Sequence, residues 1–283
     1  MKRLFFLSFL TLLSIGVSAQ RNKKPAGSEE EPVKTEKPAK GNSSKGSMAP
    51  QGSDRKHLDL MAYYMDGDYE KCYKKSVKVT EDEETSKDAL PYLYASMCLY
   101  EMSFLEQYAS AYPEGIKESL KWAGKYRKKD EKNSQKQGLN YLEFWEENEA
   151  FFGKLRKTAK DSANAQLDLG KQSKAEQIYK LILAVEPDDY SVNYMMYTMR
   201  TEANDAVNGD KYLQTFKDQV AKLDGFSGEP KDRIEMLKYA HVEYAKYLVS
   251  NNRSDVARQV LDQLTTYIGK DANVESLIEE KKL

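Results

Sequence analysis

Apolar residues recur at intervals of three and four from His57 to the end of the chain, a spacing that gathers side chains on one face of an α-helix. Alternation of apolar and polar residues with β-branched enrichment, the pattern of a strand, does not occur. The pattern predicts an all-α domain over residues 56–283. Three helical stripes are well defined: Leu90, Leu93, Tyr94, Met97 and Cys98; Ile178, Leu181, Ile182 and Val185; and Val256, Val260, Leu261, Leu264 and Ile268.

Local signals indicate where these helices begin and end. Ser173 and Glu176 have the spacing of a capping box, in which each side chain satisfies the other residue's free backbone N–H. Residues 186–188 (Glu-Pro-Asp) end one helix and open the next. Residues 225–230 and 251–252, rich in Gly, Pro and Asn, are expected to separate helices in the same way.

The predicted helices come in pairs with a recurring frame. In residues 163–187 a small residue, a turn glycine, a second small residue, two large residues and a proline follow at fixed spacing: Ala163, Gly170, Ala175, Tyr179, Ile182 and Pro187. The same frame fits around Gly67 with Cys72 and Val79, and around Asn252 with Ala245, Ala257, Leu261 and Leu264. Small residues would let paired helices approach closely, and Gly or Asn would take the turn.

This frame resembles the tetratricopeptide repeat, a helix–turn–helix unit of about 34 residues. The resemblance covers most of residues 54–283, with Ile182 where the family prefers a small residue and Glu84 and Gly269 where it prefers proline. It implies an α-solenoid of about five antiparallel helix pairs. In this family the first helix of each pair lines a concave face that binds peptides or proteins. Carried over, that register implies partner-binding side chains at Tyr64, Lys160, Asn164, Asp168, Tyr194, Thr198, Tyr239 and Lys246.

The first residues have the pattern of a signal peptide. Met1-Lys2-Arg3 is positive, residues 4–15 are apolar, and small residues follow up to Ala19. We expect cleavage between Ala19 and Gln20; an uncleaved anchor is the alternative, but the apolar run is shorter than the ~20 residues of a membrane-spanning helix. With no cysteine beside that site, no lipid anchor is expected. These features predict a periplasmic or secreted protein without a transmembrane segment in the mature chain.

Residues 20–55 form a different segment, rich in Lys, Pro, Ser, Gly and Glu and poor in apolar residues. Such a composition predicts a disordered linker, which is either a solvated spacer or an electrostatic tether. The whole chain of 283 residues has 44 basic and 45 acidic residues and a net charge of −1, so no general attraction to nucleic acid is expected. Export would permit a disulfide between Cys72 and Cys98, but two cysteines in helical patterns equally fit buried free thiols.

Candidate chemistry is sparse. His57 and His241 have no second His or Cys at ligand spacing, so neither a metal nor a cofactor is expected. Acidic pairs such as Asp188-Asp189 occur without an apolar pocket in the pattern around them. The basic run over residues 121–136 is open to two interpretations. Lys125, Arg127, Lys128 and Lys129 with Trp122 and Tyr126 either grip nucleic acid or a phosphorylated glycan, or form the solvated end of a helix. We favour the second interpretation, because an exported protein is not expected to meet nucleic acid.

These observations favour a non-catalytic scaffold that binds a protein or peptide partner in the cell envelope, in assembly or secretion. The alternative is a glycan- or nutrient-binding accessory protein, because starch-binding lipoproteins of the outer membrane also contain such repeats. The chain has few aromatic-rich insertions that would stack sugars, and no nucleophile, base and metal constellation of an envelope hydrolase is recognisable.

Overall fold

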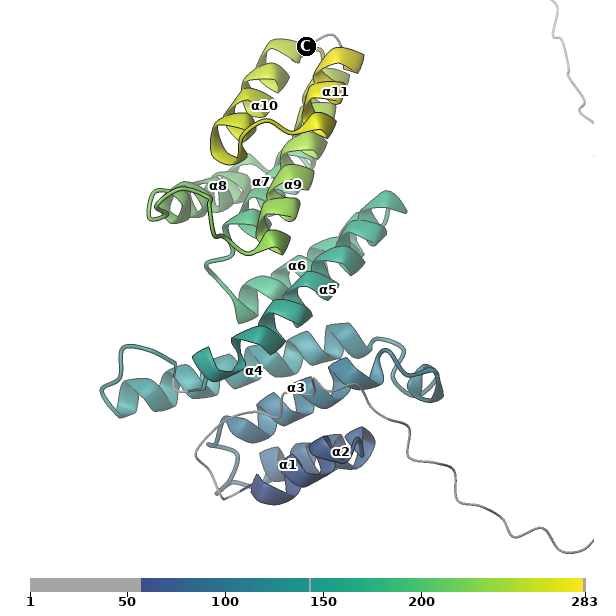
Figure 1. The fold of residues 1–283 in the computed structure, drawn as a ribbon, viewed down its shortest axis with the longest axis vertical. Helices are drawn as coiled ribbons and strands as arrows, with labels where there is room; N and C mark the ends of the chain where they lie inside the picture. The colour runs from purple at the N-terminus through teal and green to yellow at the C-terminus, as the bar shows by residue number, and fades with distance from the viewer. Residues whose placement is uncertain (1–56, 143, 282–283) are drawn as a thin grey trace, which may run out of the picture. The chain divides into compact units, whose positions relative to one another are not determined.

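The computed structural model describes residues 57–142 and 144–281, all within one compact unit of the chain. The expected signal peptide and linker lie outside these residues. The described ranges contain eleven α-helices and no strand, which confirms the all-α prediction for this part of the chain (Figure 1). The helices are α1 (Leu58–Met65), α2 (Tyr69–Glu81), α3 (Leu90–Met102), α4 (Gly115–Lys136), α5 (Glu149–Asp168), α6 (Gln172–Val185), α7 (Tyr190–Glu202), α8 (Ala206–Val220), α9 (Lys231–Ser250), α10 (Ser254–Ile268) and α11 (Ala272–Lys281).

Consecutive helices pack as pairs, α1 with α2 and so on to α9 with α10, and α11 contacts α10 (Figure 1). Successive pairs are joined by contacts of α2 with α3, α4 with α6, α6 with α7 and α7 with α9. Helix α3 lies between α2 and α4, and all its residues from Leu90 to Leu99 are buried. A helix that is apolar on every side is expected where neighbours cover it on every side.

The tight turns within pairs use residues with positive φ. Gly67 has φ 78°, Gly170 has φ 70° and Asn252 has φ 58°, at the positions where the frame requires a turn. Only Gly and, less readily, Asn adopt this left-handed conformation at low cost. Asn204, with φ 56°, makes the corresponding turn between α7 and α8. The connection from α3 to α4 is longer and contains a short 3₁₀ helix, Glu106–Tyr108.

The capping box predicted at Ser173 is wrong. Helix α6 already begins at Gln172, so Ser173 lies inside the first turn and no side chain caps the helix. Glu176 instead forms ion pairs with Lys180, at 2.5 Å, and with Arg200 of α7. The neighbouring break was predicted correctly: α6 ends at Val185, and the carboxylate of Asp189 accepts hydrogen bonds from two backbone N–H groups at the start of α7.

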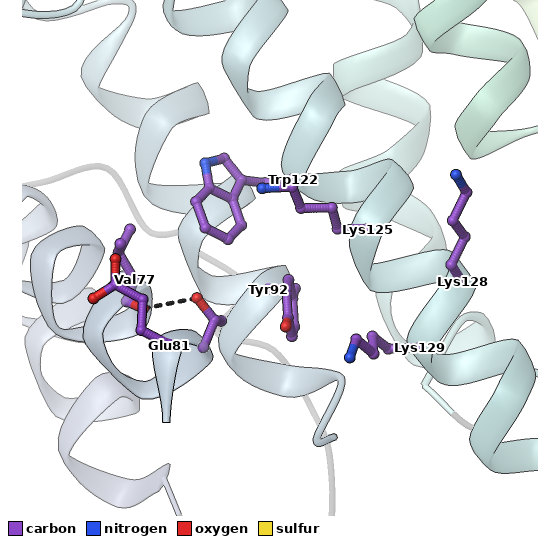
Figure 2. A pocket seen from close by; sticks show the side chains of 8 residues that line it. Val77, Glu81, Tyr92, Trp122, Lys125, Lys128 and Lys129 are labelled. Carbon is purple, nitrogen blue, oxygen red and sulfur yellow. Dashed lines mark hydrogen bonds between the residues drawn. The ribbon is translucent and has the colours of Figure 1, made fainter. Parts of the chain in front are cut away.

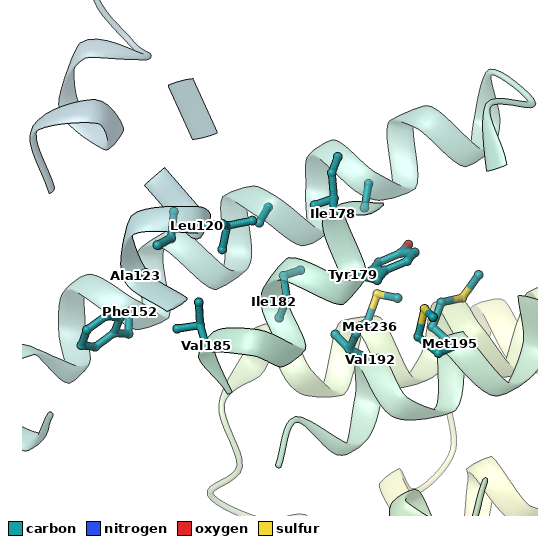
Figure 3. Packing of buried hydrophobic residues seen from close by; sticks show 14 of the residues in the cluster. Leu120, Ala123, Phe152, Ile178, Tyr179, Ile182, Val185, Val192, Met195 and Met236 are labelled. Atoms are coloured by element: carbon teal, nitrogen blue, oxygen red, sulfur yellow. The ribbon is translucent and has the colours of Figure 1, made fainter. Parts of the chain in front are cut away.

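The apolar core continues from one pair to the next. Figure 3 shows Leu120 and Ala123 of α4, Phe152 of α5, residues of α6, and Val192 and Met236 of α7 and α9 in one packed cluster. The small residues of the frame behave as predicted, because Ala163 and Ala175 are fully buried where α5 and α6 meet. Each helix is therefore held by apolar contact with its own partner and with the next pair.

Polar contacts also join helices inside this core. The hydroxyl groups of Ser96 in α3 and Ser119 in α4 each donate to the other residue's carbonyl oxygen, at 2.9 and 2.8 Å. Cys72 and Cys98 are free thiols, both buried, and the Cys72 thiol lies 3.4 Å from the carbonyl oxygen of Leu60. Burial, together with the neighbouring Cys72, raises the pKa of the Cys98 thiol well above its usual value, so this thiol stays protonated.

Candidate functional site

Half of the side chains expected to bind a partner are buried. Tyr64 and Lys160 are each 2% exposed, Tyr194 is 3% exposed and Thr198 is fully buried. Tyr194 stacks on the ring of His241, with ring centroids 3.9 Å apart. The repeat register placed these four on a binding face, but the structure places them in helix packing, where no partner can reach them without movement of the helices.

The other four reach the surface around α5 and α9. Asp168 and Lys246 are exposed, and Asn164 and Tyr239 are half-buried. The Tyr239 hydroxyl donates to Asp168 at 3.1 Å, and Lys246 forms an ion pair with Glu243 at 2.7 Å. Asn164 accepts from Tyr179 at 2.5 Å. Their polar groups already have partners within the chain, and their role in binding stays a prediction.

A buried ionic cluster, which the sequence did not indicate, lies where α5, the α6–α7 turn and α9 meet. The Arg156 guanidinium forms two hydrogen bonds with Asp232, at 2.7 and 2.9 Å, and one with Glu186 at 2.6 Å. Lys160 Nζ lies 2.7 Å from Asp189 Oδ2 and 3.0 Å from Asp232 Oδ2. The Arg233 guanidinium adds a bond to Glu186 at 2.8 Å. We call Arg156, Lys160, Glu186, Asp189, Asp232 and Arg233 the ionic cluster.

The ionic cluster balances three basic groups against three carboxylates. Burial alone would raise the pKa of Asp232, but hydrogen bonds from Arg156 and the charge of Lys160 outweigh it and lower this pKa to about 2. Burial likewise raises the pKa of Glu186, against the opposing charge of Arg156. Because opposite charges already surround each group, the cluster fits a structural joint between helices better than a reactive centre.

Both histidine side chains are buried. The His241 ring is fully buried, and its Nδ1–H donates to the carbonyl oxygen of Leu237 at 2.9 Å. Burial lowers the pKa of His241 to about 4, which keeps it neutral near pH 7. His57 lies 2.9 Å from the carboxylate of Asp88. Both rings therefore have polar partners within the chain.

The best candidate for ligand binding is a cleft between α2, α3 and α4, of about 510 Å³ (Figure 2). We call it the α2–α4 cleft. Figure 2 shows Tyr92 of α3 and Trp122 of α4 between Glu81 of α2 and the lysines of α4. Its lining residues are Val77, Thr80, Glu81, Tyr92, Trp122, Lys125, Lys128 and Lys129.

The position of two of these lysines is set by aromatic rings. Lys125 Nζ lies 4.0 Å from the centroid of the Trp122 ring, and Lys129 Nζ lies 5.5 Å from that of Tyr92. The two lysines are four residues apart, so they follow one face of α4. Attraction between an ammonium group and a ring face favours these positions and reduces the freedom of the side chains. The cleft therefore presents partly ordered cations beside an apolar floor.

A second cleft occupies the corresponding place two helix pairs further along the chain, between α6, α7 and α8, with a volume of about 540 Å³. We call it the α6–α8 cleft. Like the first, it is formed by the second helix of one pair and both helices of the next, and it also contains basic residues. Its lining includes Lys180, Arg200 and Lys211.

The sequence indicated one wall of the α2–α4 cleft and missed the other. Trp122 and the lysines were recognised as a basic, aromatic run, and the preferred interpretation was a solvated helix end. Tyr126 and Arg127 of that run do not line the cleft: Tyr126 is fully buried, and Arg127 donates to the carbonyl oxygen of Val185 at 2.8 Å. The wall formed by α2 lies some forty residues away in the chain, and no local signal connects the two.

Comparisons with protein-family models, with curated proteins and with solved structures found no match for this chain. Over residues 57–142 and 144–281, no three His, Cys, Asp or Glu side chains are grouped in a way that could hold a metal ion. In the same ranges no helix is both long enough and apolar enough to cross a membrane.

Proposed function

We propose that this protein is an exported, non-catalytic scaffold of the tetratricopeptide type, and that it binds a protein or peptide partner of the cell envelope at the α2–α4 cleft. The observation that carries the proposal is the cleft itself. It is open to solvent, it lies between successive helix pairs, and it combines an apolar floor with cationic side chains. Binding sites commonly have this composition.

Two further observations support a binding role over catalysis. Asp232 and His241, whose pKa values are strongly lowered, are engaged in the ionic cluster and buried in helix packing respectively. The α2–α4 cleft offers lysines and aromatic rings but no nucleophile held against a base. Catalytic sites usually bring such groups together in one cavity.

Site-specific photocrosslinking in intact cells tests the proposal. A photoreactive phenylalanine analogue replaces Glu81, which is exposed on the wall of the cleft, in a tagged full-length chain. The control carries the same group at Lys231, whose side chain is 90% exposed and remote in sequence from the cleft. A discrete adduct with one or two envelope proteins at Glu81 and none at Lys231 is expected. Equal adducts at both positions, or none at Glu81, would contradict the proposal.

A further inference from the structure

The α2–α4 cleft carries an uncompensated positive charge. Lys125, Lys128 and Lys129 line it, and none of them forms an ion pair with an acidic residue of the described chain. Among the described residues that line it, the only carboxylate is that of Glu81, which lies on the opposite wall (Figure 2). At neutral pH the lining therefore has a net charge of +2, in a protein whose net charge is −1.

The α6–α8 cleft shows that this charge is not a general property of the fold. Lys180 forms an ion pair with Glu176 at 2.5 Å. Arg200 pairs with Glu176 and, at 3.2 Å, with Asp205. Both clefts thus contain basic side chains, but acids of the chain itself compensate two of them in the α6–α8 cleft. An anionic ligand would gain less there, because it would have to compete with these acids.

The aromatic rings of the α2–α4 cleft leave little face for stacking. Lys125 covers one face of Trp122, while Tyr92 and Tyr73 contact the same ring at centroid distances of 5.8 and 6.3 Å. Tyr92 is 7% exposed and has Lys129 over its ring. Sugars and nucleic-acid bases bind aromatic side chains mainly through an open ring face. The rings here position cations, which disfavours glycans and single-stranded nucleic acid as ligands.

We propose that the α2–α4 cleft binds an acidic peptide segment, in which carboxylates contact Lys125, Lys128 and Lys129 and an apolar side chain packs between Val77 and Tyr92. This inference rests on the proposed binding function and specifies the class of partner. The lysines belong to α4, the second helix of its pair, whereas the repeat register had placed the binding residues on first helices. Carboxylates suit ammonium groups as ligands because both carry a full charge at neutral pH.

Fluorescence anisotropy with labelled peptides tests the inference on the full chain. The probe is a short peptide in which glutamate alternates with leucine, and its control has glutamine in place of glutamate. The variant K125Q/K129Q removes two charges from the α2–α4 cleft, and K180Q/K211Q removes two from the α6–α8 cleft. We expect K125Q/K129Q to bind the acidic probe roughly tenfold more weakly than the unchanged protein, and K180Q/K211Q to bind it about equally well.

Several results would overturn the inference that the α2–α4 cleft binds an acidic peptide. Equal weakening by both double variants, or equal affinity for the glutamine peptide, would overturn the inference. The inference would also be overturned if a thymidine oligonucleotide or an anionic polysaccharide displaced the acidic probe at a lower concentration than the unlabelled peptide does. Circular dichroism and thermal melting establish that both variants remain folded. A crosslinked partner retained by K125Q/K129Q would leave the proposed scaffold function intact and reject the acidic ligand. Binding of the acidic peptide without any crosslinked partner in cells would support the acidic ligand and reject the proposed scaffold function.

Discussion

Acid should weaken this fold through His241 at a higher pH than through Asp232 of the ionic cluster. The ring is fully buried against Tyr194, and burial lowers its pKa from 6.5 to about 4. Between these two values the unfolded chain binds a proton at this residue and the folded chain does not. The free energy of unfolding therefore falls as the pH decreases from about 6.5 to about 4. Asp232, with a pKa lowered to about 2, contributes only at lower pH.

The size of the effect follows from the two pKa values. The complete contribution is about 3 kcal/mol, since each pKa unit corresponds to about 1.4 kcal/mol. At pH 5 roughly 2 kcal/mol of it should be lost relative to pH 7. Loss on this scale is a large share of the stability of a typical domain, about 5–15 kcal/mol, so it should be readily measurable.

Urea unfolding, followed by far-ultraviolet circular dichroism at about pH 7 and pH 5, measures this contribution. The control is His241→Phe, which keeps a flat aromatic ring against Tyr194 but cannot be protonated. Other titrating groups, including Glu186, are present in both proteins and cancel in the comparison. We expect the unchanged protein to lose roughly 2 kcal/mol more than the variant over this interval. A difference below about 0.5 kcal/mol, which is the usual scatter of such comparisons, would refute the reasoning.

Four further predictions concern stability and are measured by the same unfolding assay at neutral pH. Arg156→Met should lower the free energy of unfolding by about 3–5 kcal/mol, because it leaves Glu186 and Asp232 buried without their main partner. The control, Lys157→Met at an exposed position, should change it by less than about 0.5 kcal/mol. Similar small losses in both variants would contradict the role of the ionic cluster. Gly170→Ala should lower the free energy of unfolding by about 1 kcal/mol because φ at this residue is 70°, while Gly153→Ala, inside α5, should be neutral or stabilising. A larger loss for Gly153→Ala than for Gly170→Ala would contradict this argument. Ser96→Ala should cost about 1–2 kcal/mol by breaking the reciprocal bonds with Ser119. Ser173→Ala should lower the free energy of unfolding by less than about 0.5 kcal/mol. A loss near 1 kcal/mol would indicate that Ser173 does cap α6.

The sequence was most informative where a local rule determines the structure. Turns at Gly67, Gly170 and Asn252 and the helix end before Pro187 follow from backbone preferences of single residues, and these were predicted correctly. Helix periodicity also identified the all-α class. The capping box at Ser173 failed because the helix begins at Gln172, two residues before the start that the box predicts, so Ser173 is already inside the helix.

Burial was harder to predict than helix position. The register put Tyr194 and Thr198 on a binding face, but α7 packs against both α8 and α9, which leaves it little exposed surface. The register also put Lys160 on the binding face, but the side chain is buried. Its partners Asp189 and Asp232 lie 29 and 72 residues further along the chain, and no single-sequence pattern relates positions so far apart. The two walls of the α2–α4 cleft were hidden for the same reason.

The ionic cluster has a consequence for how the chain folds. Most helix contacts join neighbours in sequence, so pairs can form locally and rapidly. The bonds between Arg156 and Asp232, 76 residues apart, form only after α5 and α9 have both been placed. Joining α5 to α9 links the stability of the first six helices to that of the later ones. The ionic cluster adds to the apolar contacts between the two groups of helices, so unfolding should be more cooperative with the cluster than without it.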